Sequence, residues 1–451
     1  MIDLEEYLRI ELSIPNLDEE VVHGVPIWRL ARTQFRWMVR DSRPFTVSPN
    51  IKLSEFVVNY IKSFWSFIKI FFFGKHISAV FFPHPRLFYV DDIYLERLSD
   101  PLIDSWGIDD YVIMERHQNG IHKRPRYHQS NLIYLDYIDS TVRMLSVVFK
   151  PFFKRTYGKE VNSLYSKLDS VLHLEDDKYK ALFVNVITNY VLSRCLVAPI
   201  MRKLKPNLVF FSPRGTFDYA TTYCKQHGST IIELQHGIVI GKTVLYTSNS
   251  YNRDYDPDYF FVFGPSNIGT QYGMPINRVK NIGYPYKDYL KERNTVSYQE
   301  NVGLVASEPG ITGQIIEVLI DIVSKYPQYE FRIRCHPQER FSEKHYNMIS
   351  NYPQIKVVDN HLESFCAISQ YKVVVGEISS VLFEAMSLHK KVARLNYGGL
   401  KATETELLHG GTVINCAEDY HRFMTEAYSD ENDSKDVYSD YQPDTIKSII
   451  K

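Results

Sequence analysis

Short apolar runs alternate with longer helix-forming segments along most of this chain, and this alternation constrains the fold more strongly than any other feature. A first series of strand candidates covers 77–82, 111–116, 131–137, 207–212, 230–235, 259–264 and 279–285. A second series covers 301–307, 330–335, 355–359, 372–377, 391–396 and 411–415. Strands that alternate with helices form parallel sheets with helices on both faces. The sequence therefore predicts an α/β fold with two such sheets.

A charged and polar stretch at 286–300 separates the two series. A chain of 451 residues is too long for one compact core. We therefore predict a helical N-terminal extension at 1–72, a Rossmann-like domain at 73–290 and a second Rossmann-like domain at 291–451. The two sheets are expected to face each other across a cleft, with ligands at the carboxyl ends of the strands.

The charges are balanced, with 52 Lys and Arg against 53 Asp and Glu, so no global field attracts nucleic acid. The cysteines, which form no CxxC pair, are Cys195, Cys224, Cys335, Cys366 and Cys416. This pattern argues against a disulfide framework or a zinc cluster and indicates a reducing cytoplasm. The acidic start, "MIDLEEYLRIEL", lacks the basic and apolar regions of a signal peptide.

The aromatic segment 56–83 is the part of the sequence that would touch a membrane. Lys62, Lys69 and Lys75 interrupt its apolar runs, so none reaches the roughly 20 residues that span a bilayer. One interpretation is an interfacial helix with Trp65 in the headgroup zone and the lysines extended toward water. The other, which we favour because buried helices of this kind are common, is a core helix followed by the first strand.

Three predicted strands end in polar residues. The strand 330–335 runs into "RCHPQE", where Pro337 imposes an extended backbone on His336. Arg334 and His336 lie two residues apart and so share one face of a strand. An arginine and a histidine at a strand tip can bind a phosphate or a diphosphate, whereas the competing interpretation is a turn with an exposed histidine.

The second tip, "GEISSVLFEA", combines an apolar strand, paired hydroxyls and the start of a helix. Ser379 or Ser380 is placed to cap that helix. The N–H groups and the positive dipole end at its start would then form an anion site. Glu384, about one turn later, is a candidate acceptor of hydrogen bonds from ribose hydroxyls. The alternative is an ordinary serine cap with Glu384 on a solvated face.

The third tip, "ELQHG", belongs to the first series and would approach the cleft from the other side. A neutral imidazole at His236 is suited to removing a proton from an acceptor hydroxyl near pH 7. Glu233 is an alternative base, or would orient the imidazole. Gly237 would let the backbone approach a ligand closely, and Gln235 is a further candidate contact. The competing interpretation is a structural histidine in a turn.

Three weaker features complete the candidates. The His-Pro pair at 84–85 is a candidate to face the acceptor, but we favour a turn. The acidic pair at 91–92 suggests a metal site, but we interpret it as a loop or a helix start. Arg214, at another strand tip, is a candidate contact to an acceptor phosphate.

The set Gln235-His236-Gly237, Arg334-x-His336-Pro337 and Ser379-Ser380 with Glu384 downstream resembles the GT-B-fold transferases of bacterial surface polysaccharides. The most similar groups are the CDP-glycerol glycerophosphotransferases of teichoic acid synthesis and the bacterial sialyl-, polysialyl- and Kdo-transferases. The resemblance covers roughly 205–400. It implies that the His-Pro and Ser-Ser pairs hold the phosphate of a cytidine nucleotide, and that the His-Gly pair carries the base.

Two positions depart from these families. The glycerophosphotransferases usually show Trp where this chain has Gln235. The acidic pair before a glycine that serves as the base site in sialyl- and Kdo-type enzymes has no counterpart, and Glu233 and Glu308 are the nearest acids.

The resemblance implies a GT-B fold with an acceptor domain at 73–290 and a nucleotide-sugar-binding domain at 291–451. It implies an inverting glycosyltransferase, with no bound metal or other cofactor, that uses a nucleotide sugar, a CMP-sugar being favoured. The acceptor would be a growing glycan or lipid-linked glycan of capsule, O-antigen or lipopolysaccharide. The expected location is the cytoplasm, peripheral at the inner face of the cell membrane, with no nucleic-acid partner. A CDP-glycerol-type polyol-phosphate transferase, a nucleotide-sugar epimerase and a non-catalytic binding protein stay open as alternatives.

Overall fold

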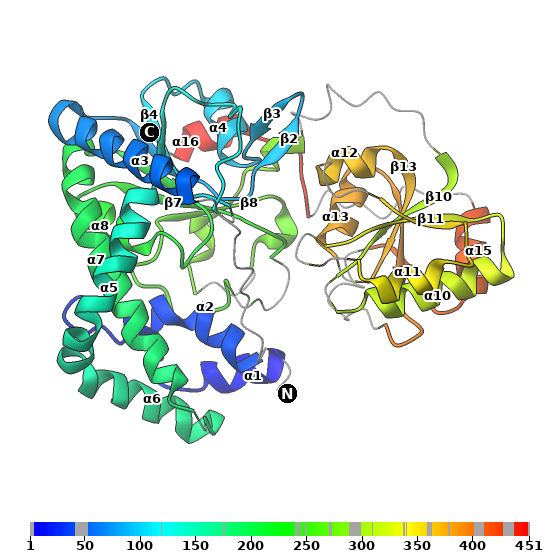
Figure 1. Ribbon diagram of the computed structural model, residues 1–451, viewed down its shortest axis with the longest axis horizontal. Helices are drawn as coiled ribbons and strands as arrows, with labels where there is room; N and C mark the ends of the chain where they lie inside the picture. Colours follow the sequence, from blue (N-terminus) through cyan, green and yellow to red (C-terminus); the bar gives the residue numbers. More distant parts are fainter. Residues whose placement is uncertain are drawn as a thin grey trace. The chain divides into compact units, whose positions relative to one another are not determined.

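The structure is a computed structural model of the chain. It describes residues 4–40, 53–118, 120–174, 176–239, 243, 245–248, 250–269, 273–287, 299–308, 310–336, 339, 341–358, 363–377, 379–400, 410–426 and 437–449. The chain divides into two compact units. The first consists of Met1–Leu87, Ile93–Val262 and Ile268–Lys280, and the second of Phe88–Asp92, Phe263–Asn267 and Asn281–Lys451. Each unit is built around its own sheet (Figure 1).

The first sheet has seven strands in the order β5-β4-β1-β6-β7-β8-β9. Their bounds are β1 Ala79–Phe82, β4 Tyr111–Glu115, β5 Leu132–Tyr134, β6 Leu208–Phe211, β7 Thr230–Leu234, β8 Tyr259–Val262 and β9 Val279–Asn281. Neighbouring strands from β5 to β8 run parallel. The first series of predicted strands is confirmed.

The second sheet has six parallel strands in the order β12-β11-β10-β13-β14-β15. Their bounds are β10 Gln299–Ala306, β11 Glu330–Arg334, β12 Ile355–Val357, β13 Tyr371–Gly376, β14 Lys391–Leu395 and β15 Thr412–Ile414. Figure 1 shows helices on both sides of this sheet. They are α10 Thr312–Lys325, α11 Glu343–Ile349 and α15 Ala417–Thr425 on one side, and α12 Ser364–Ser369 and α13 Ser380–Ser387 on the other. The second series and the α/β class are confirmed as well.

A third, two-stranded sheet was not expected. It pairs β2 (Phe88–Val90) with β3 (Ile93–Leu95). The acidic pair at 91–92 forms the turn between them, with φ angles of 49° and 62°. Asp tolerates this left-handed region better than most residues, so the pair serves the turn. Three-residue strands are too short to leave a periodic pattern.

Alternating side chains of β1 and β6 supply the two faces of the first sheet. Val80 and Phe82 lie in a core shared with the long helices. Phe81 points to the opposite face, where it stacks on Phe210 with 4.7 Å between ring centroids. Trp106 of α4 (Ser99–Trp106) packs edge-on against Phe210 at 5.4 Å. This period of two is what a strand covered on both faces requires.

The helices of the first unit are mostly long. Besides α4 they are α1 Leu4–Leu12, α2 Ile27–Arg40, α3 Leu53–Phe73, α5 Asp136–Thr156, α6 Gly158–Leu172, α7 Lys178–Leu204 and α8 Asp218–Gln226, and α16 Pro443–Ile449 ends the second unit. Among the described helices, only α7 is long and apolar enough to cross a membrane. It buries Phe183 and Ile187 completely and packs against α5 and α8, so its apolar character serves the core.

The first three helices belong to the same core as the first sheet. Leu8 of α1 and Trp28 and Phe35 of α2 are buried in it. Helix α3 buries Phe67 but leaves Trp65 57% exposed. The favoured interpretation of α3 as a core helix therefore holds for one face of the helix and is wrong for the other.

Candidate functional site

Two histidine rings, one beyond the tip of β1 and one beyond the tip of β7, stack on each other. His236 lies two residues beyond the end of β7, and His84 lies two residues beyond the end of β1. Only β6 separates these strands in the sheet, so both side chains stand at the same carboxyl edge. The ring centroids are 3.9 Å apart and the rings are inclined by 20°. The His-Pro pair at 84–85, for which we favoured a turn over a position facing the acceptor, thus meets the predicted base.

Burial and positive charge lower the proton affinity of both rings. Burial, followed by the guanidinium groups of Arg97 and Arg86, lowers the pKa of His236 to about 3. Burial, the neighbouring His236 ring and the same two arginines lower the pKa of His84. Arg97 donates to the backbone oxygen of His236 at 3.2 Å, and the N–H of Arg86 donates to Nδ1 of His84 at 3.1 Å. Both imidazoles are therefore neutral at pH 7 and able to accept a proton.

Gln235 holds the turn after β7 from the inside. It is fully buried, and its side-chain amide donates to the carbonyl of Gly237 at 2.6 Å. Being buried, it presents no side-chain surface to an acceptor. No described atom lies within 4 Å of the position that a Cβ on Gly237 would take. There is accordingly room beside this turn for a ligand to approach the backbone.

Glu233, the alternative base, is buried in an ion pair with Arg214. Oε1 of Glu233 accepts a hydrogen bond from the backbone N–H of Arg214 at 2.8 Å, and Oε2 accepts one from Nε of Arg214 at 3.0 Å. Burial raises the pKa of Glu233, and the charge of Arg214 opposes that rise. Glu233 has no exposed surface and Arg214 is 8% exposed. The two candidates bind each other across the tips of β6 and β7.

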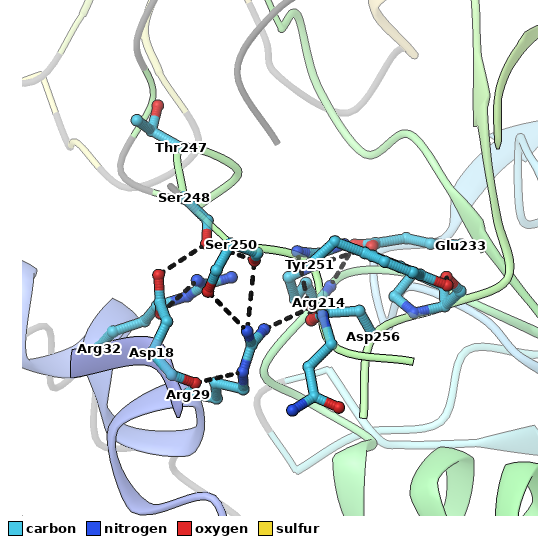
Figure 2. A network of polar contacts seen from close by, with 12 residues as sticks. Asp18, Arg29, Arg32, Arg214, Glu233, Thr247, Ser248, Ser250, Tyr251 and Asp256 are labelled. Carbon is cyan, nitrogen blue, oxygen red and sulfur yellow. Dashed lines mark hydrogen bonds and ion pairs between the residues drawn. The ribbon is translucent and has the colours of Figure 1, made fainter. Parts of the chain in front are cut away.

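Figure 2 shows that this ion pair is part of a larger polar network. Arg214 also lies 3.8 Å from a carboxylate oxygen of Asp256, which pairs with Arg29 of α2. Arg32, one helical turn further along α2, lies 3.3 Å from Asp18. Charges removed from water are costly unless they are paired. The network therefore fixes α2 against the strand tips and explains the position of Arg214 without a ligand.

In the second unit, the tip of β13 leads into α13. Ser379 is the N-cap of this helix, and its hydroxyl accepts a hydrogen bond from the N–H of Val381 at 3.4 Å. Ser380 is the first residue of the helix. A Cβ on Gly376, the last residue of β13, would come within 2.9 Å of the carbonyl oxygen of Ala306 in β10. The glycine thus permits close contact between the two strands that lead to this edge.

The end of β11 brings Arg334 to the same edge of the second sheet. Burial alternates along β11, and Arg334 and His336 both fall on the partly exposed side. Burial lowers the pKa of Arg334, while the charges of Glu363 and Glu384 act in the opposite direction. Glu363 caps α12, accepting hydrogen bonds from two backbone N–H groups. Glu384 is 3% exposed, which excludes the solvated-face interpretation.

The start of α10 differs from that of α13. The carboxylate of Glu339 accepts hydrogen bonds from the hydroxyl of Thr312 and from the N–H of Gly310. A negative charge therefore already occupies the N-terminus of α10, whereas a neutral serine caps α13.

Sequence reasoning missed three neighbours of the candidates. Arg97 and Glu363 reach them only through tertiary structure, so no local pattern identifies them. A signal did exist for His84, because a His-Pro pair directly after an apolar strand repeats the pattern at His336. Pro337 lies outside the described residues. Within the part of the chain that the structure describes, no three His, Cys, Asp or Glu side chains are arranged to hold a metal ion.

No protein-family model and no curated protein matches this sequence. Among solved structures, the UDP-GlcNAc 2-epimerase of Methanocaldococcus jannaschii is 13% identical, with 83% of this chain and 98% of that chain covered and a TM-score of 0.50. The wall teichoic acid polymerase TagF is 12% identical, covering 95% of this chain and 98% of its own, with a TM-score of 0.47. The glycotransferase of kitacinnamycin is 10% identical, covering 84% and 99%, also with a TM-score of 0.47. Together with the two parallel sheets, the likeness to the epimerase confirms the α/β fold of GT-B type, and it concerns the fold alone.

Proposed function

We propose that this chain is an inverting, metal-independent glycosyltransferase. It would move a sugar from a nucleotide-activated donor, with a CMP-sugar favoured, to a growing glycan of capsule, O-antigen or lipopolysaccharide. The observation that carries the proposal is the stacked pair of His84 and His236, 3.9 Å apart. It presents a neutral imidazole beside an open turn, at the edge where α/β sheets bind ligands. The resemblance of the strand-tip motifs supplies the reaction class.

His236 is the proposed general base. Its imidazole would take the proton of the acceptor hydroxyl while the acceptor oxygen attacks the anomeric carbon of the donor. The bond from that carbon to the phosphate oxygen would break, and the nucleotide would leave with the electron pair. Attack from the side opposite the leaving group inverts the anomeric centre. Glu233 is less suited because both of its oxygens already accept hydrogen bonds from Arg214.

Substrate binding is part of this proposal, because a general base works best with a pKa near the operating pH. His236 alone, with a pKa of about 3, is too weak a base. The charges of Arg97 and Arg86 contribute to this low pKa, so neutralising them would raise it. A donor or acceptor phosphate bound beside them would offset their charges and favour the protonated imidazole.

The second unit would bind and stabilise the leaving nucleotide. The N-terminus of α13, at Ser379 and Ser380, directs N–H groups and the positive dipole end toward an anion. Arg334 and His336 stand at the tip of β11, separated from β13 only by β10. We assign them to the phosphate, and Glu384 to the ribose. Stabilising the charge that develops on a leaving group is usually a large part of catalysis.

The proposed setting is the cytoplasm, at the inner face of the cell membrane. The partners would be the nucleotide sugar and a glycan or lipid-linked glycan acceptor, with no bound cofactor.

A nucleotide-sugar epimerase is the second candidate, because the fold likeness spans 98% of the M. jannaschii epimerase. It would convert the nucleotide sugar with no acceptor present. A polyol-phosphate transferase would direct the acceptor to phosphorus and leave a phosphodiester in the product. A non-catalytic protein would bind the donor without consuming it.

The first experiment is a thermal-shift panel of CMP, CDP, UMP, UDP, GDP and dTDP on the whole protein. A ligand at 100 times its dissociation constant adds about 2.7 kcal/mol to the free energy of unfolding. Selective stabilisation by CMP or CDP supports a cytidine donor. Stabilisation by another nucleotide overturns that choice, and no response to any of them favours a non-catalytic protein that binds a glycan.

Two variants then test the assigned roles. We expect His236→Ala to lose transfer but to keep the nucleotide-induced thermal shift, because His236 belongs to the first unit. We expect His336→Ala to lose both. Transfer at the native rate by both variants would show that the site is misassigned.

A further inference from the structure

Helix α5 exposes a stripe of apolar side chains. Met144, Val147, Val148 and Phe152 are 58%, 77%, 71% and 61% exposed. Met144, Val148 and Phe152 follow one another at intervals of four residues and Val147 follows Met144 by three, which places them on one face of the helix. Val142, on the other face, is buried in the core. The exposed stripe is therefore additional to the residues that hold α5 in the fold.

Helix α3 carries a second exposed stripe and contacts α5. Val58, Ile61, Trp65 and Phe72 are exposed on it, again at helical spacing. Tyr137 of α5 packs against three aromatic rings of α3, with centroids 5.2 to 5.9 Å away, so the two helices are in direct contact (Figure 1). The eight residues of the two stripes are called here the α3–α5 surface.

Positive charge accompanies the α3–α5 surface. The exposed cations of the two helices are Lys62, Lys69, Arg143, Lys154 and Arg155. Glu55 is the one exposed acid among the described residues of these helices. Asp136 and Asp139 are paired with His122 and Arg116. In a chain whose net charge is −1, this is a local excess of positive charge.

We propose that the α3–α5 surface docks on a membrane that contains anionic lipids. Aromatic and aliphatic side chains would enter the headgroup region while the lysines and arginines meet the lipid phosphates. Cores of protein–protein interfaces are depleted of charged residues, and lysine is depleted in such interfaces generally. Lysines such as Lys62 and Lys69 on a helix with exposed apolar side chains therefore favour a membrane over a protein partner. The inference rests on the peripheral location in the proposed function, but lipid binding is measured without any reaction.

Vesicle flotation of the full chain tests this surface. The vesicles contain phosphatidylcholine alone or with phosphatidylglycerol, at low and at high salt. We expect binding that requires phosphatidylglycerol and weakens with salt. Lys62→Gln/Lys69→Gln should lower the partition coefficient about 30-fold. Val147→Glu/Val148→Glu should lower it at least about tenfold, because charge replaces apolar surface.

Ile276→Glu is the matched control, because Ile276 is 66% exposed but lies outside the α3–α5 surface. It should bind vesicles as the unmodified chain does. Binding by neither vesicle type, or equal binding by all variants, overturns the proposal. A dimer seen by light scattering without lipid would also overturn the proposal if Val147→Glu/Val148→Glu dissociated it, because the surface would then join two copies of the chain. The nucleotide-induced thermal shift should be unchanged in this variant, which separates failure of the surface from failure of the proposed reaction.

Discussion

Strand geometry separates the two side chains that competed for the role of base. Glu233 lies within β7, and its side chain turns inward to Arg214. His236 lies beyond the end of the strand, where it meets His84. The sequence places both residues at one strand tip, but only the structure shows which of them has its oxygens occupied. The choice of His236 therefore depends on contacts between β7 and its neighbours β1 and β6.

The stack on His84 is expected to hold the His236 ring in position. His84→Ala removes the stack, whereas His84→Phe keeps a ring of similar shape. An aromatic pair contributes up to about 1.5 kcal/mol, so we expect His84→Ala to lower kcat roughly tenfold if that energy orients the base. His84→Phe should stay close to the unmodified enzyme. Transfer rates of the three proteins check this, and equal losses in both variants would assign His84 a role other than stacking.

Loss of the buried charge of Glu233 should destabilise the first unit. Glu233→Gln leaves Arg214 with a weaker partner in a buried position, at a cost of about 3 kcal/mol. Lys167→Gln is the control, because the Lys167–Glu20 pair is exposed and such pairs contribute at most about 1 kcal/mol. Urea unfolding measures both changes. Similar small shifts in the two variants would show that the pair is not important for stability.

Local signals predicted the elements well and their contacts poorly. The serine cap of α13 and the strand tip before His336 follow from short patterns that need no knowledge of the fold. The contacts of Arg97 and Glu363 depend on segments far apart in the sequence. The apolar spacing of α5 predicts a helix but not which face finds a partner, so its exposed stripe was missed. The interpretation of α3 as a core helix was wrong on one face for the same reason.

Two glycines at or beyond strand ends should respond differently to alanine. Gly376→Ala would place a Cβ 2.9 Å from the Ala306 oxygen, so β13 and β10 must shift. Overpacking of this kind costs about 1–3 kcal/mol. Gly237→Ala meets no atom within 4 Å and should leave stability nearly unchanged. Thermal unfolding tests the pair, and a stable Gly376→Ala protein would show that the two strands have room to separate.

At the scale of the whole molecule, the strand tips and the helices α3 and α5 differ in the charges that they carry. The strand tips hold neutral histidines and paired carboxylates, while α3 and α5 expose five cations and, among their described residues, one acid. Each sheet has its own buried core, and the proposed nucleotide site and the proposed lipid-binding surface belong to different units. This separation is why the two can be tested independently.

Two histidines should give the stability of the whole protein opposite responses to pH. The pKa of His236 is lowered by burial and by Arg97 and Arg86, to about 3. The stability that the neutral imidazole of His236 contributes is complete above the pKa of an unfolded histidine, about 6.5. It is lost as the pH falls toward 3. The slope is about 1.4 kcal/mol per pH unit, so roughly 2 kcal/mol is lost between pH 6.5 and 5. The asparagine of His236→Asn does not titrate. The difference in free energy of unfolding between this variant and the unmodified chain should therefore shrink by this amount on acidification.

His122 should show the reverse. Burial lowers the pKa of His122, but its hydrogen bonds to Asp136 at 2.7 Å and Glu115 at 3.3 Å raise that pKa by a larger amount. The net shift of the pKa is therefore upward. The stabilisation from this imidazolium is complete below about pH 6.5 and is lost as the pH rises through the raised pKa. His122→Asn should therefore be most damaging in acid, and His236→Asn least damaging there. Urea unfolding of the three proteins from pH 5 to 9 measures this. Parallel curves of the free energy of unfolding against pH for the three proteins would contradict this. They would mean that His236 is not held neutral and His122 is not held protonated by their surroundings.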